Sequence, residues 1–153
     1  MANSIRQQIM DAVIDALEGI TVANGYVTEV AYISEILPYS IEQIDKSKLP
    51  AGFPIDTDET KEQMSFGSAN NMTAILTVLI TWIVFQKNNV TRQARCDLLR
   101  DCEKAMMSDS SLAALILQIY PTRVTTDKGQ IPNYSVFDQE FEISYIYSHA
   151  DGG

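Results

Sequence analysis

The run from Met72 to Phe85, MTAILTVLITWIVF, constrains the fold most, because its fourteen residues include no charge. A membrane-spanning helix needs about 20 predominantly apolar residues, but this run is preceded by polar Asn70 and Asn71 and, before them, by Gly67-Ser68. More than half of its residues are β-branched, which favours the pleated surface of a sheet over a helix. The run is therefore predicted to be a strand and not a membrane span.

As a strand, this run would have one wholly apolar face and one mixed face, because successive side chains point to opposite sides. The apolar face carries Ala74, Leu76, Val78, Ile80, Trp82 and Val84. The other face mixes threonine with large hydrophobic residues. We expect helices to cover the first face and something else to bury the second in part. At about 3.3 Å per residue the strand would exceed the width of a small domain, so it either bends near Met72 or projects at one end.

Two stretches have the periodicity of amphipathic helices. Ser4 and Gln7 have the spacing of a capping box, and apolar residues then recur every three or four positions as far as Ile20. A second helix is predicted from Asn88 or Asn89 to about Met107. Its inner stripe comprises Val90, Ala94, Leu98, Cys102, Ala105 and Met106.

Shorter segments complete the predicted fold. Residues 26–33, 53–55 and 141–147 have the composition or alternation of strands, and the apolar stretch from 112 is predicted to turn and then form a strand that reaches 126. Pro121 places that strand at an edge. Residues 34–51 lack a sustained period and predict a loop with at most one helical turn.

This order of elements predicts a single α+β domain over residues 1–153. Two amphipathic helices would pack on one face of a mainly antiparallel, twisted sheet. Fraying is expected at 1–3 and 149–153. The charged stretch DTDETKEQ predicts a surface turn or hairpin tip, and residues 56–71 as a whole would form a projecting loop or arm.

The charge balance excludes some classes of partner. The chain has 20 acidic and 11 basic residues, for a formal net charge of −9. Tight nucleic-acid binding requires a basic footprint, and anionic lipid repels an acidic chain. Such a chain suits a surface past which DNA slides without binding. Cys96 and Cys102 lie about 240° apart around the predicted helix, so they do not pair, and with no apolar signal region they indicate a reducing cytoplasm.

The sequence contains no convincing catalytic or metal motif. Residues 56–60 match the D-x-D-x-T pattern of aspartyl-phosphate phosphatases, but the other elements that such enzymes need are missing. The same stretch fails as an EF-hand, because Lys61 stands where glycine is required and Gly67 where glutamate is required. His149, the single histidine, lies near the C-terminus. We therefore predict no catalytic residue, no metal ligand, no cofactor and no enzymatic activity.

Several stretches, taken in order, resemble phage tail terminator proteins of the lambda minor tail protein U type. They are SIRQQIMDAVIDALEGI, TVANGY, LPAGFPI, the long strand with the helix after it, DSSLAALILQIYPTRVTTDKG and QEFEISYIYSHADGG. The likeness covers nearly the whole chain except residues 34–48 and 56–71. It rests on the order of elements and on no single diagnostic motif.

The resemblance implies a structural virion protein. Tail terminators assemble in the host cytoplasm as a six-membered ring on the head-proximal end of the tail tube. The ring stops tube growth and offers a surface to head-completion or neck proteins. Its partners are further copies of itself, the tail tube protein and the neck, and DNA passes through its lumen without specific binding. The family offers no catalytic residues to carry over.

Two groups of residues are candidates for contacts in such a ring. An acidic group is predicted to face the lumen or the tube: Asp56, Asp58, Glu59 and Glu62. An aromatic group is predicted to lie in subunit contacts: Trp82, Phe85, Tyr145 and Tyr147. For the aromatic residues, simple packing in the sheet core is at least as good an explanation.

Two other functions remain open at this point. One is a head-tail connector or head-completion protein, which the sequence separates poorly from a terminator. The other is a small ligand-binding or enzymatic domain. A deep pocket lined by carboxylates with perturbed pKa values would favour the second alternative, whereas a flat wedge with two unlike faces would favour the ring.

Overall fold

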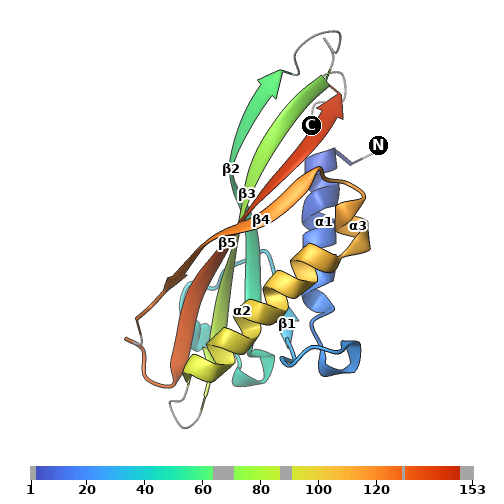
Figure 1. The fold of residues 1–153 in the computed structure, drawn as a ribbon. Helices are drawn as coiled ribbons and strands as arrows, with labels where there is room; N and C mark the ends of the chain where they lie inside the picture. The colour runs from blue at the N-terminus through green and yellow to red at the C-terminus, as the bar shows by residue number, and fades with distance from the viewer. Residues whose placement is uncertain (1–2, 64–70, 87–90, 129, 149–153) are drawn as a thin grey trace.

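Five strands form one twisted sheet in the computed structural model, which describes residues 3–63, 71–86, 91–128 and 130–148 (Figure 1). The strands are β1 (Tyr32–Ile33), β2 (Ala51–Gln63), β3 (Asn71–Phe85), β4 (Gln118–Thr126) and β5 (Tyr134–Ser148). Their order across the sheet is β1-β2-β3-β5-β4. Only the β1–β2 pair is parallel, so the predicted α+β class with a mainly antiparallel sheet is confirmed.

The described helices are α1 (Ile5–Glu18), α2 (Thr91–Ser108) and α3 (Ser110–Ala113), and all lie on one face of the sheet (Figure 1). We call this face the inner face. The Ser4 hydroxyl caps α1 by accepting a hydrogen bond from the Gln7 backbone N–H, as the capping-box spacing predicts. The short α3, capped by Asp109, follows α2 at a place where the sequence predicted no further helix. The predicted caps of α2 and Val90 lie outside the described residues.

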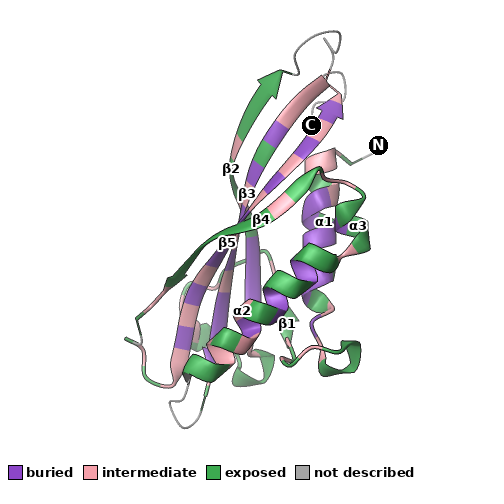
Figure 2. Ribbon diagram, in the orientation of Figure 1, coloured by how far each residue is buried: buried purple, intermediate pink, exposed green. Residues whose placement is uncertain are grey.

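The core lies between the inner face and the helices, as predicted. All six residues of the apolar face of β3, from Ala74 to Val84, are buried. Opposite them, α2 buries Leu98, Cys102, Ala105 and Met106, and β5 contributes Phe137, Phe141, Ile143 and Tyr145. Figure 2 shows the resulting alternation of buried and half-buried positions along β3 and β5. This alternation fixes the register of the two long strands, because a slip of one residue would expose the core positions.

Among the described residues, a segment covers one end of the outer face of the sheet. There, the segment before β2 folds over Ala51, Phe53 and Ile83 through its residues Ile41 and Ile44. Two 3-10 turns, Ile41–Gln43 and Lys46–Lys48, form within this segment, where we expected at most one helical turn. Further along the same face, Ile55 and Ile75 are 48% and 38% exposed.

The predicted first strand at 26–33 is mostly wrong, because only Tyr32–Ile33 pairs with the sheet. The backbone N–H groups of Val27 and Thr28 instead donate to the buried carboxylate of Asp101 in α2, at 3.0 and 2.7 Å. The Val30 N–H donates to the carbonyl of Ile20. This segment is therefore held by the helical layer, which satisfies donors that a strand would offer to a neighbour.

The predicted turn at 56–63 is also wrong, because these residues continue β2. A β-bulge sets Thr57 and Asp58 opposite the single residue Thr77 of β3. Beyond it, β2, β3 and β5 extend past the end of β4, which pairs no further along β5 than Ser144 (Figure 1). We call this extension, residues 59–63, 71–75 and 144–148, the arm. Residues 64–70 of the expected loop lie outside the described residues.

Candidate interaction surface

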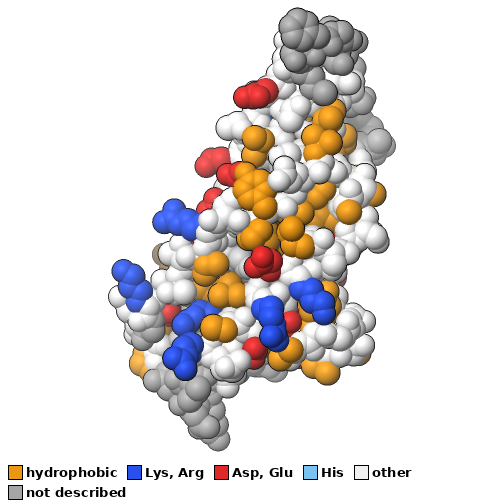
Figure 3. All heavy atoms as spheres, viewed as in Figure 1, with side chains coloured by type: hydrophobic (Ala, Val, Ile, Leu, Met, Phe, Trp, Pro, Cys, Tyr) orange, Lys and Arg blue, Asp and Glu red, His pale blue; other side chains and the backbone are white. Residues whose placement is uncertain are grey.

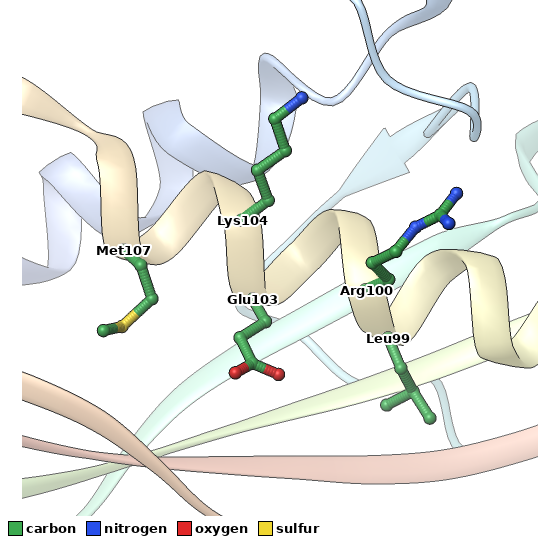
Figure 4. A pocket seen from close by; sticks show the side chains of 5 residues that line it. All are labelled: Leu99, Arg100, Glu103, Lys104 and Met107. Atoms are coloured by element: carbon green, nitrogen blue, oxygen red, sulfur yellow. The ribbon is translucent and has the colours of Figure 1, made fainter.

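The hollows of the described surface are open. One of about 580 Å³ lies over α2 and is lined by Leu99, Arg100, Glu103, Lys104 and Met107. In Figure 4, Arg100 and Lys104 extend to one side of the helix, and Leu99, Glu103 and Met107 extend to the other. A catalytic site needs side chains that converge on one reacting atom. Among the described residues, no group of three or more His, Cys, Asp or Glu side chains could hold a metal ion.

A second hollow, of about 430 Å³, is formed by the segment that covers the outer face. Its lining includes Tyr32, with the Lys48 ammonium 4.8 Å from the ring centroid, and Ile36, which is 80% exposed. Nearby Tyr39 is 98% exposed. The hollow is a largely apolar surface feature.

The strongest electrostatic feature is a cluster where α1 meets the arm, made of Arg6, Asp56, Glu59, Lys61 and Tyr145. The Arg6 Nε donates to Asp56 Oδ2 at 2.7 Å, and another guanidinium nitrogen donates to Glu59 Oε2 at 3.2 Å. The Tyr145 hydroxyl donates to the same Glu59 oxygen at 3.0 Å. The Lys61 ammonium lies 3.5 Å from Glu59 Oε1. The Glu59 side chain is only 5% exposed, so this arm cluster compensates a buried carboxylate.

The arm cluster shifts the pKa values of its members. Burial, then the hydrogen bond to Glu59 and the charge of that carboxylate, raise the pKa of Tyr145 above its ordinary value. The pKa of Lys61 is raised chiefly by its interaction with Tyr147, whose ring centroid lies 5.0 Å from the ammonium. Burial opposes the charge of Arg6, but the hydrogen bond and charge of Asp56 outweigh it and raise the Arg6 pKa. These shifts favour the protonated forms that hold α1 against the arm.

The predicted acidic group does not form one surface. Asp56 and Glu59 turn toward Arg6 on the inner side, where both carboxylates are already bound. Asp58 and Glu62 are exposed, and neither forms an ion pair with any residue in the described ranges. The four residues lie in a strand and its bulge, not in a loop. Only Asp58 and Glu62 are therefore available to an external partner.

The aromatic group is mostly core. Trp82 and Tyr145 are fully buried and Tyr147 is 5% exposed, so all three side chains pack inside the subunit. Core packing, the alternative explanation, accounts for them. Phe85 is half-buried on the outer face, with its ring centroid 5.0 Å from that of Tyr134 and 4.4 Å from the Lys46 ammonium. For Phe85 the interface prediction stands untested.

The basic side of the molecule was not predicted from the sequence. Figure 3 shows Lys and Arg side chains gathered over α2 and the neighbouring end of β4, whereas carboxylates lie along the edge of the arm. The basic group includes Arg92, Arg123 and Lys128, all exposed. The signal was present in the sequence, because residues 118–126 contain an arginine and no acidic residue in a chain of net charge −9.

The sequence matches no protein-family model, and no curated protein was found that resembles it closely enough to count as a relative. Within the described ranges, none of the helices has the length and apolar character needed to cross a membrane. The resemblance to tail terminators thus rests on the order of residues and elements set out above.

Proposed function

We propose that this protein is a phage tail terminator, which forms a ring on the head-proximal end of the tail tube. The ring stops tube polymerisation and provides the surface to which the head or neck attaches. The observation that carries this proposal is a subunit with two unlike sheet edges, the β2 edge and the β4 edge. A ring of identical copies needs two different lateral surfaces on each copy, because each contact is heterologous.

The remaining features support the same proposal. The arm extends three strands past the end of β4, which gives the subunit a reach beyond its helical body (Figure 1). The open end of the outer face offers half-exposed apolar residues, Ile55 and Ile75, for contact with another tail protein. The net charge of −9 suits a channel through which DNA passes without binding.

No observation favours an enzymatic or ligand-binding role. The two hollows described above are open, and the largest pKa shifts belong to Cys102 and Tyr145, which lie in the core and in the arm cluster. The arm cluster consists of bound ion pairs and presents no free acid beside a cavity. A terminator accounts for the charged edges without requiring a catalytic site.

The experiment that tests the proposal is deletion of the gene from its phage genome, followed by electron microscopy of the particles. We expect headless tails of uncontrolled length, because the growing tube is no longer capped. Supplying the wild-type protein in trans restores tails of uniform length. Tails of normal length beside unattached heads would assign the protein to the neck instead, and normal infectious particles would contradict both roles.

A further inference from the structure

The two edges of the sheet, formed by β2 beyond Gly52 and by β4, differ in charge. β2 has no strand neighbour beyond Gly52 on its outer side, within the described residues, and β4 ends the sheet on the other side. The outer edge of β2 carries the exposed carboxylates Asp58 and Glu62. We call this the acidic edge. Neither carboxylate has a cation within ion-pair distance among the described side chains, so both charges are open to a partner.

The opposite edge carries unpaired cations. Arg123 lies in β4 and Lys128 follows that strand, while Arg92 lies in the first turn of α2, which packs against β3, β4 and β5. All three side chains are exposed, and none forms an ion pair with a described residue. We call these residues the basic edge.

The edges are poorly suited to extend the sheet into another copy by backbone pairing. Pro54 in β2 and Pro121 in β4 each lack a backbone N–H, and each strand also has a register irregularity, at 56–59 and 121–123. Prolines, charges and bulges on edge strands prevent continuous pairing with another chain. A contact between edges would therefore depend mainly on side chains.

We propose that copies of this chain join head to tail, the acidic edge of one against the basic edge of the next. Two acidic edges repel each other, as do two basic edges, so two-fold dimers through like edges are disfavoured while the mixed contact is attractive. A heterologous contact that closes by rotation gives a ring. The inference rests on the proposed function, because a tail terminator requires a closed ring. It adds the two surfaces through which the copies would join.

The test uses two charge-reversal variants of the full chain. Asp58→Lys/Glu62→Lys makes both edges basic, and Arg123→Glu/Lys128→Glu makes both edges acidic. Sedimentation velocity at low salt measures association of each variant alone and of an equal mixture. We expect each variant alone to associate at least about tenfold more weakly than the wild type, and the mixture to recover association by alternating the two variants. Added salt should weaken wild-type association.

The matched control for Asp58→Lys/Glu62→Lys is Asp11→Lys/Glu18→Lys, which makes the same change in net charge on the exposed side of α1. It should associate as the wild type does, and circular dichroism checks that all variants are folded. The inference is overturned if either edge variant alone assembles normally, if the mixture is no better than its components, or if the wild type stays monomeric at low salt. The proposed function is tested separately, by the length of the tails in the deletion. If the edge variants assemble normally and the deletion still gives overlong tails, this contact is rejected while the terminator function stands.

Discussion

The two ends of the long strand β3 are stabilised in different ways. In the body, which we define as the part of the sheet covered by α2, its inner side packs Ile80 and Trp82 against Phe137 and other core residues. In the arm, the same face of the sheet buries Ala74 and Tyr145 and also meets α1 through charges, because Arg6 binds Glu59. Both regions use one continuous strand with one alternation of side chains. Ion pairs therefore add to apolar packing at the arm end of the strand, whereas apolar packing predominates in the body.

Stability and sensitivity to solution conditions are therefore not uniform along one sheet. Burial of apolar surface responds little to salt or to pH, whereas paired charges respond to both. We therefore expect the body to determine global unfolding and the arm to respond first to changes of solution. Three substitutions and one change of pH test this contrast.

Removing the largest core side chain should affect the whole fold. Trp82→Ala leaves a cavity beneath α2 and should lower the free energy of unfolding by about 3–5 kcal/mol. Urea denaturation followed by circular dichroism measures this loss. Phe85→Ala, in the same strand but half-buried on the outer face, serves as the control and should cost clearly less. Equal losses for the two variants would contradict the contrast between the faces of β3.

Gly52 leaves room for the Trp82 ring, so adding a methyl group there should destabilise the body. A Cβ at position 52 would lie 2.5 Å from Trp82 Cζ3 and 2.8 Å from Cη2. Gly52→Ala should cost about 1–3 kcal/mol through overpacking. In the double variant Gly52→Ala/Trp82→Phe the smaller ring relieves the clash, so its loss should be less than the sum of the two single losses. Strict additivity in urea denaturation would show that the two positions do not interact.

Breaking the arm cluster should affect the arm more than the body. Arg6→Met removes the cation that binds Glu59, whose side chain is 5% exposed. Because the Arg6 side chain is 32% exposed and Lys61 stays nearby, we expect a loss of about 1–2 kcal/mol, below that of a fully buried pair. Hydrogen exchange should rise in the arm before it rises in the body. Glu59→Gln in the Arg6→Met background should recover part of the loss; no recovery would mean that the buried charge is not the cause.

Alkaline pH should weaken the arm slightly. The folded-state pKa of Tyr145 is raised from its ordinary value of 10.0, so its contribution is complete below about pH 10 and is lost as the pH rises toward the folded-state pKa. Lys61, with a raised pKa, acts in the same direction. Between about pH 9 and about pH 10.5 the loss due to Tyr145 should stay below about 1 kcal/mol. Tyr145→Phe should lose less unfolding free energy over this pH range than the wild type does. An equal loss in the two proteins would show that Tyr145 is not the cause.

Local patterns predicted the elements that carry their own signal. The β-branched run from Met72 predicted β3 and its buried face, and the Ser4 cap with its apolar period predicted α1. These features succeed because strand alternation and helix periodicity are properties of neighbouring residues. The helix stripe from Leu98 to Met106 was predicted for the same reason, and it is buried.

The features that the sequence did not predict depend on distant partners. Residues 56–63 look like a polar turn until Arg6, about fifty positions earlier, binds Asp56 and Glu59 and makes a charged strand stable. The segment 26–31 has strand-like composition, but Asp101 of α2 takes its backbone donors. The aromatic candidates for subunit contacts also depend on distant partners, because neighbouring residues do not determine whether a side chain is buried. Aromatic character alone does not distinguish a core position such as Trp82 from an exposed one.

The bulge in β2 also sets how this region tolerates changes of chain length. Before it, Gly52, Pro54 and Asp56 pair with inner-facing residues of β3, and after it Glu59 and Lys61 do so. Deleting either Thr57 or Asp58 would place Glu59 two positions after Asp56, so regular alternation would keep Glu59 and Lys61 on the inner face without a bulge. Deleting both would make Glu59 adjacent to Asp56 and would turn Glu59 and Lys61 to the outer face. Among natural variants of this protein, we therefore expect loss of one residue between Asp56 and Glu59 but not loss of both, because the second loss separates Glu59 from Arg6.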